Sequence, residues 1–115
     1  MIKRKTDYTI SQNENMRGGD GVVTIKHLLT PQELYEKGRL YAVLVLEPGC
    51  SVGSHVHEGE MESYYIIRGE AEVSDNGELV TVAAGDSVLT RSGEEHSIKN
   101  IGDDTLELMA LIIYK

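Results

Sequence analysis

The sequence contains no tryptophan or phenylalanine, and its 115 residues include only one cysteine and two prolines. Because Cys50 is alone, no intramolecular disulfide can form, and a reducing, cytoplasmic environment is expected. The apolar runs are short, and LYAVLVL at 40–46 is far below the length of a membrane span. The N-terminal stretch MIKRKTDYTIS is basic but carries no apolar segment, which predicts that there is neither a signal peptide nor a membrane partner.

Positive charge is also scarce, since 11 Lys and Arg residues face 19 Asp and Glu residues and leave a net charge of −8. This surplus of negative charge argues against nucleic acid as a partner, because the phosphate backbone would be repelled. The length is that of one ordinary domain with a core of its own, and no interior linker is visible. We therefore predict a single domain over residues 1–115.

Residues that favour strands and turns are abundant. Twelve glycines are scattered among many Val, Ile, Leu and Thr residues. The segment at 22–29 predicts a strand, and the DNG sequence at 75–77 between alternating segments predicts a hairpin. The segment at 30–38 predicts one short helical turn, with Thr30 as N-cap and Glu33 completing a capping box. About nine or ten short strands in close succession indicate a sandwich or barrel.

Two of the four histidines are separated by a single residue in the stretch GSHVHEGEMESYYIIRG. Because side chains alternate along a strand, His55 and His57 are expected to project from the same face. Two imidazoles held at a fixed short separation are a good start for chelating a transition metal. On its own, such a pair is more often a surface or packing feature of a strand than a metal-binding pair.

A metal site would need further ligands from nearby elements. Three carboxylates follow the histidine pair, and Glu62 is the preferred candidate because a turn before it could return it beside the imidazoles. Glu58 and Glu60 would then lie in that turn. The fourth ligand would come from a distant strand, for which His96 and His27 are the candidates.

Two longer patterns resemble the motifs of the cupin superfamily. The stretch GCSVGSHVHEGEMESYYIIRG resembles the first cupin motif, and the matching positions are Gly49, His55, His57, Glu62 and Gly69. The stretch GDSVLTRSGEEHSIKN resembles the second motif, and the matching positions are Gly85, Gly93, His96 and Asn100. Arg91 departs from the pattern because it stands where the family usually has proline.

The resemblance implies an all-β fold, a double-stranded β-helix or jelly-roll (cupin) barrel with one short helical turn. It places a metal-binding core at about 40–113 and one divalent ion per chain. The implied ligands are His55, His57, Glu62 and His96. Three imidazoles and a carboxylate suit first-row transition metals, with Mn expected first and then Fe, Zn, Ni or Co.

The stretches at 16–19 and 27–34 also resemble small bacterial cupins of the oxalate decarboxylase-like group. This implies that a small carboxylate is bound, or transformed by decarboxylase or dioxygenase chemistry, and leaves open whether turnover occurs. A sugar-phosphate isomerase-like cupin acting through a Lewis acid and a non-catalytic binding module are the alternatives. Glu60 is the candidate catalytic acid, while Tyr64 and Arg17 are candidates for binding the substrate.

Apolar residues exceed what one small barrel needs inside, notably in the runs YAVLVL and LMALIIY. Small jelly rolls also expose sheet edges and faces that can pair with a second copy. We therefore predict a homodimer to which residues 6–28 contribute.

Overall fold

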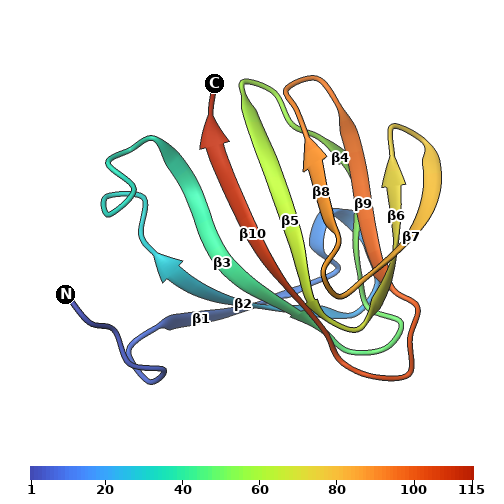
Figure 1. The fold of residues 1–115 in the computed structure, drawn as a ribbon, viewed down its shortest axis with the longest axis horizontal. Coiled ribbons are helices and arrows are strands. Elements are labelled where there is room, and N and C mark those ends of the chain that lie inside the picture. The colour runs from blue at the N-terminus through green and yellow to red at the C-terminus, as the bar shows by residue number, and fades with distance from the viewer.

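The computed structural model describes residues 1–115 and contains ten strands and one short 3₁₀ turn, η1 (Met16–Gly18). The strands form two antiparallel sheets that face each other across the core (Figure 1). This is the predicted all-β jelly roll. No helix in the molecule is long and apolar enough to span a membrane.

The larger sheet has six strands. Their order across the sheet is β1 (Thr9–Glu14), β2 (Val22–Leu29), β3 (Gly38–Leu46), β10 (Leu106–Tyr114), β5 (Glu60–Arg68) and β8 (Ser87–Thr90). The smaller sheet has four strands, in the order β4 (Ser51–Val56), β9 (Glu95–Asn100), β6 (Glu70–Asp75) and β7 (Glu78–Ala83). From β3 to β6 each strand lies in the opposite sheet from the one before it, so these successive connections cross between the sheets.

The core follows the two-residue alternation of the strands. From Leu106 to Ile112 in β10, every second residue is buried and the others are partly exposed, because only one face of the sheet meets the opposite sheet. Leu106 and Leu108 lie at the start of β10 and join Leu46 and Ile98 in the apolar core. Further along the same inner surface, polar residues replace apolar ones. The candidate site therefore occupies one end of the barrel.

Two local predictions can be compared directly with the structure. The DNG sequence forms the hairpin between β6 and β7, with Asn76 and Gly77 both in left-handed backbone conformations. The segment at 30–38 forms its capping box, with the Glu33 amide donating to Thr30 Oγ1 at 3.1 Å. It then continues as hydrogen-bonded turns rather than as a helix, because Tyr35 and its successor also adopt positive φ.

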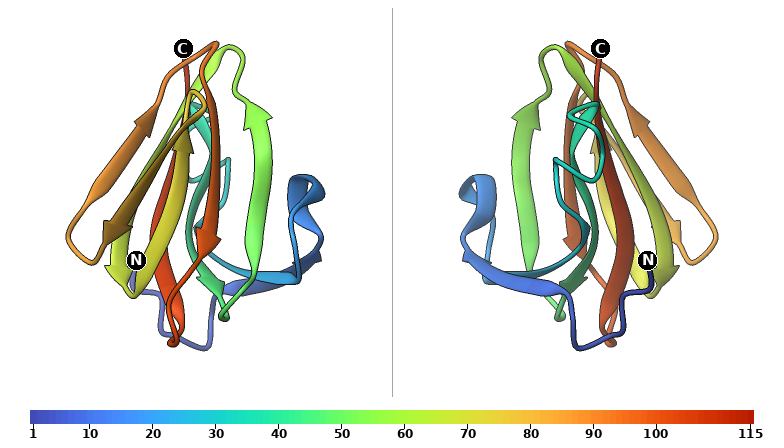
Figure 2. Two further views of the ribbon diagram at one scale, coloured as in Figure 1. Left: turned by 90° about the vertical axis from the view of Figure 1, so that its right-hand side faces the viewer. Right: turned by 90° about the vertical axis from the view of Figure 1, so that its left-hand side faces the viewer.

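The N-terminal segment adds β1 to the edge of the larger sheet, next to β2. After β1 the chain forms η1, which packs on β4 in the opposite sheet. Figure 2 shows η1 standing beside β4, with β1 and β2 running across the base of the molecule. The N-terminal segment therefore closes one side of the barrel.

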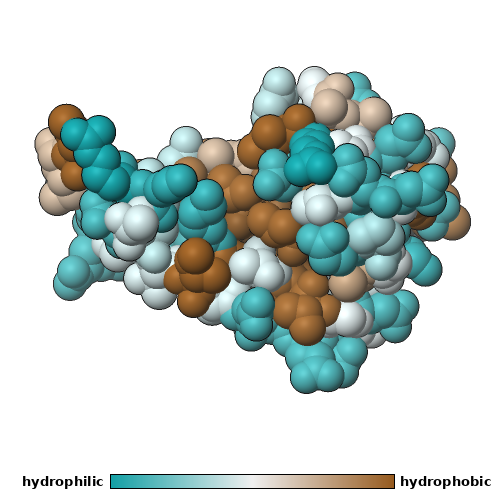
Figure 3. All heavy atoms as spheres, turned by 90° about the horizontal axis from the view of Figure 1, so that it is seen from below, coloured by the Kyte–Doolittle hydropathy of each residue, from teal (hydrophilic) through white to brown (hydrophobic).

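The outer face of the larger sheet carries a cross-strand apolar patch, here called the outer patch. Its members are Tyr41, Val43, Tyr65, Leu89, Met109 and Leu111, which lie on β3, β5, β8 and β10. Tyr65 is 51% exposed and Leu89 is 44% exposed, so much of this apolar surface meets solvent. Seen from below, apolar side chains also gather near the middle of the surface, between hydrophilic groups (Figure 3).

Candidate metal centre

Four side chains converge inside the barrel, and they are the four that the resemblance implies as ligands. His55 lies on β4 directly opposite His96 on β9, while His57 follows the end of β4. Glu62 lies on β5 in the facing sheet. One ligand atom from each of the four lies within 4.8 Å of the others, so the group could hold a metal ion.

A β-bulge lies between Val52 and His55, where the pairing of β4 with β9 shifts register. Bulges re-aim the side chains that follow them, and they are frequent beside functional sites. The paired histidines therefore depend on this irregularity as well as on simple strand alternation.

The spacing of the donor atoms fits a single ion. The three imidazole Nε2 atoms lie 3.1–3.2 Å apart, and Glu62 Oε1 lies 3.0 Å from Nε2 of both His57 and His96. Donors at right angles around an ion, with bonds of about 2.1 Å, lie about 3 Å apart. His55 and Glu62 are further from each other, with no contact within 4.0 Å.

Among the four donor atoms, five of the six pairwise distances are short and one is long. A tetrahedral arrangement would make all six distances equal. They match four corners of an octahedron in which His55 and Glu62 lie opposite each other. Two adjacent corners then carry no protein donor. The donor set therefore fits an ion that accepts imidazole and carboxylate ligands and also binds a further molecule.

The second ring nitrogen of each histidine has its own neighbour. His55 Nδ1 donates to the carbonyl of Gly53 at 2.7 Å, and His96 Nδ1 lies 2.8 Å from Thr90 Oγ1. His57 Nδ1 lies 3.6 Å from Glu60 Oε1. Contacts of this kind fix the ring orientation, so that all three Nε2 atoms face the centre of the cluster.

Charges within the cluster are strongly coupled. Burial raises the pKa of Glu62, but hydrogen bonds from His57 and His96 outweigh it, and the pKa falls from 4.5 to about 2. The hydrogen bond to Glu62 raises the pKa of His57, whereas burial lowers the pKa of His55. A buried, ionised carboxylate surrounded by imidazoles is chemically suited to a divalent cation.

A cavity of about 320 Å³ opens beside the cluster, and it is lined by His55, His57 and Glu62. The two predicted substrate-binding residues, Tyr64 and Arg17, both line it as well. The Tyr64 ring stacks on His96 with centroids 5.0 Å apart, and burial raises the pKa of its hydroxyl well above the ordinary value. Much of the remaining wall is apolar, including Met16, Leu40, Leu44, Val52 and Ile112.

Arg17 reaches this cavity because η1 lies very close to β4. A β-carbon on Gly53 would lie 2.1 Å from the carbonyl oxygen of Arg17, and one on Gly19 would lie 2.3 Å from that of Ser51. Only glycine allows the two backbones to approach so closely. Arg17 itself has a left-handed backbone, with φ of 56°. Met16 and Arg17 of η1 therefore form part of the cavity wall.

Glu60, the predicted catalytic acid, does not line this cavity. It faces the side of His57 turned away from the cluster and is bound by Arg39, whose Nε donates to Oε2 at 2.7 Å. The hydrogen bond from Arg39 lowers the pKa of Glu60. No local sequence pattern predicts this partner, because Arg39 lies 21 positions before Glu60.

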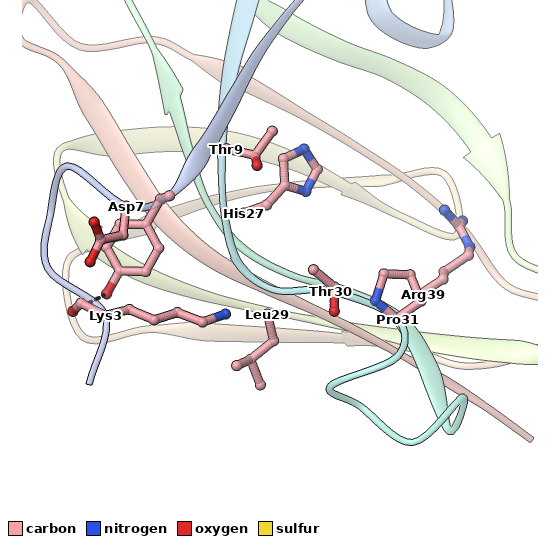
Figure 4. Close-up of a pocket in the computed structure, with 9 residues that line it drawn as sticks. Lys3, Asp7, Thr9, His27, Leu29, Thr30, Pro31 and Arg39 are labelled. Atoms are coloured by element: carbon pink, nitrogen blue, oxygen red, sulfur yellow. Dashed lines mark hydrogen bonds between the residues drawn. The ribbon is translucent and has the colours of Figure 1, made fainter. Parts of the chain in front are cut away.

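His27, the alternative fourth ligand, lies outside the cluster, and its Nε2 is 3.2 Å from Ser11 Oγ. It stands between the metal-side cavity and an outer cavity of about 320 Å³, and it lines both (Figure 4). The two cations of the outer cavity are both paired, Lys3 with Glu33 and Arg39 with Glu60. The outer cavity therefore offers no free cation to an anionic ligand.

Comparisons with known proteins agree with this geometry. Residues 42–114 match the Cupin domain family. An oxalate-binding protein from Thermotoga maritima is 49% identical over 113 residues, which cover 98% of this chain and 93% of the relative. A crystal structure from the same organism, described as a predicted oxalate decarboxylase, matches with a TM-score of 0.96 and 48% identity over 100% of both chains.

A putative sugar phosphate isomerase from Acidithiobacillus ferrooxidans is more distant. It matches with a TM-score of 0.71 at 24% identity, over 82% of this chain and 60% of its own. That likeness shows the shared fold alone. The family match and the identity to the Thermotoga protein together show that this chain belongs to the cupin family.

Proposed function

We propose that this cupin binds a small carboxylate, oxalate or a close relative of it, at a divalent metal held by His55, His57, Glu62 and His96. The observation that carries the proposal is the cavity that Arg17 lines together with three members of the cluster, His55, His57 and Glu62. The similarity to an oxalate-binding protein at 49% identity supports the same ligand class.

The residues around the cavity have complementary tasks. A bound divalent ion supplies a Lewis acid with positions open to carboxylate oxygens. The Arg17 guanidinium can pair with a carboxylate oxygen from η1, and the Tyr64 hydroxyl offers a donor from β5. The apolar wall limits water around the ligand and strengthens these polar contacts. Mn is the proposed native ion, followed by Fe, Zn, Ni or Co.

Binding has more support than turnover. Decarboxylation requires an acid that can protonate the carbon left behind, and such an acid has to reach the ligand. Glu60 would have to leave Arg39 and move past His57 to do so. We therefore place ligand binding first and decarboxylase or dioxygenase chemistry second. The isomerase-like alternative has less support, because the structure that suggests it shares only the fold.

Metal analysis tests the site directly. The purified native protein should contain about one equivalent of Mn or Fe per chain. His55→Ala should lose the metal, whereas His27→Ala, outside the cluster, should retain it. If neither the native nor the reconstituted protein takes up metal, the proposed site is wrong.

Calorimetry with oxalate tests the ligand. Oxalate should bind the metal-loaded protein but not the metal-free protein. Arg17→Gln should weaken oxalate binding by about 10–150-fold while metal content stays unchanged, because a charge-assisted hydrogen bond is worth about 1.5–3 kcal/mol. Equal oxalate affinity of Arg17→Gln and wild type would remove Arg17 from the ligand site.

We also propose that the chain forms a homodimer through the outer patch. The patch is apolar, spans neighbouring strands and is substantially exposed in one chain. Exposed apolar patches of this kind mark protein–protein contacts, and a two-fold axis lets the same patch serve both copies.

A further inference from the structure

The three ligand imidazoles differ in what they face on the side away from the cluster. His55 faces the neutral carbonyl of Gly53, and His96 faces the neutral hydroxyl of Thr90. Only His57 faces a charged group, the carboxylate of Glu60, at 3.6 Å. A carboxylate behind a ligand imidazole makes it a stronger metal donor than a neutral acceptor does.

Glu60 is itself held by a two-pronged contact. Arg39 Nε donates to Oε2 at 2.7 Å, and Arg39 Nη2 donates to Oε1 at 3.1 Å. A forked guanidinium–carboxylate pair fixes direction as well as distance. The oxygen that accepts from Arg39 Nη2 is also the one that faces His57. Arg39 therefore determines where this negative charge lies.

The pair connects strands that are not neighbours. Arg39 lies on β3 and Glu60 is the first residue of β5, and β10 runs between them in the sheet. Figure 4 shows the Arg39 side chain extending from β3 away from Lys3 and the outer cavity's far end. The side chain also lines the metal-side cavity. The ion pair thus lies at the starts of β3 and β5, next to the ligand His57.

We propose that Arg39 and Glu60 form a positioning pair that holds His57 in its ligating orientation and sets the affinity of the site for its metal. The charge of Glu60, 3.6 Å from His57 Nδ1, favours a proton on that nitrogen, so that Nε2 presents its lone pair to the cluster. Arg39 keeps Glu60 in place and prevents it from swinging toward solvent. This inference rests on the proposed metal site, but it does not depend on which ligand the metal binds.

A purely mechanical role for the pair predicts something different. If Arg39 and Glu60 only tie strand ends together, their loss should lower thermal stability and leave metal affinity unchanged. The chain offers a matched control in Arg68 and Asp104, an ion pair at 2.7 Å at the other end of β5. It has the same donor type and no contact with the cluster residues.

The test is a titration of metal-free protein with Mn²⁺ or Co²⁺ in competition with a chelator of known affinity. Glu60→Ala should weaken metal binding by about 10–100-fold, the usual effect of losing an outer partner. Glu60→Gln keeps an acceptor without the charge and should fall between Glu60→Ala and wild type. Arg39→Gln should also weaken binding, whereas Arg68→Gln should stay within about twofold of wild type. The Co²⁺ absorption spectrum should shift in the Glu60 and Arg39 variants only.

The outcomes separate the two proposals. The positioning pair would be overturned if folded Glu60→Ala and Arg39→Gln bound metal as tightly as Arg68→Gln does. Oxalate binding is measured in parallel on metal-saturated wild type. If oxalate fails to bind while Glu60→Ala still weakens the metal, the positioning pair stands and the carboxylate function falls. Absence of metal binding by the wild type would overturn both.

Discussion

Single glycines determine how closely η1 can approach β4, the strand that carries His55. Gly53 lies at the closest of these backbone contacts. It precedes the ligand pair and carries the carbonyl that orients His55. Its α-carbon has no room for a side chain, because the backbone of Arg17 lies against it. One position therefore serves both the metal cluster and the wall of the cavity.

Gly53→Ala should destabilise the protein by about 1–3 kcal/mol, the usual cost of forcing an extra methyl group into a packed contact. Urea unfolding measures the change. Gly102→Ala is the control, because a β-carbon there would meet its nearest atom at an ordinary 3.6 Å. Equal stability of the two variants would mean that η1 moves aside freely.

The protonation of His57 and Glu62 predicts how pH governs metal binding. The raised pKa of His57 stabilises the metal-free protein below 6.5, and this contribution is lost as pH rises through the raised value. Glu62, with a pKa lowered from 4.5 to about 2, contributes stability above 4.5 that is lost as pH falls toward 2. A metal requires unprotonated imidazoles, so its stabilising effect should grow with pH.

Thermal unfolding with and without metal tests whether the stabilising effect of the metal grows with pH. The rise in Tm on adding metal should be smaller at about pH 5.5 than at about pH 8, because protons compete for the imidazoles. The His55→Ala variant, which lacks a ligand, should show no rise at either pH. A rise that is independent of pH would contradict the assigned protonation.

At the scale of elements, β9 carries both a candidate metal ligand and a residue whose side chain holds neighbouring backbone segments together by hydrogen bonds. His96 and Asn100 lie four positions apart and both face inward. The Asn100 amide donates to the carbonyls of Leu46 and Asp104 at 2.8 and 2.9 Å, and its oxygen accepts from the amide of Gly102. The second motif therefore supplies one residue to the metal cluster and another to the loop before β10.

Asn100→Ala should lower the free energy of unfolding by about 2–3 kcal/mol, because it leaves buried backbone groups without partners. Metal content should stay near that of wild type, because His96 keeps its contacts with Thr90 and Glu62. Denaturation and metal analysis on the same sample measure both. Loss of metal without loss of stability would contradict the division of roles.

The elements also show what the sequence could and could not predict. The resemblance to the cupin motifs implied all four cluster residues, whereas the residues alone left Glu60 and His27 open as alternative ligands. The strand β1 was not predicted, because TISQNE has almost no apolar residues. Its inner side chains are polar because they face cavities rather than the core. The Arg39–Glu60 pair depends on strand order, which no local pattern contains.

For the whole molecule, the outer patch predicts the oligomeric state. Light scattering should give the mass of a dimer at about micromolar concentration, as expected for a standard-sized interface. Met109→Glu, in the middle of the patch, should produce a folded monomer by placing a charge where two copies meet. Leu79→Glu is the control, because Leu79 is 66% exposed on β7 in the other sheet. A monomeric wild type would refute the proposed dimer.

One strand that lines the ligand cavity, β1, is also an edge strand of the larger sheet. β1 has a neighbour on one side only, and Ser11 and Asn13 on it line the metal-side cavity. Edge strands open locally at lower free energy than central strands. Amide hydrogen exchange should therefore be fast in β1 and slow in β10, and a bound ligand should slow exchange mainly in β1. The entrance to the site would then be set by the fraying of an edge strand rather than by a hinged lid.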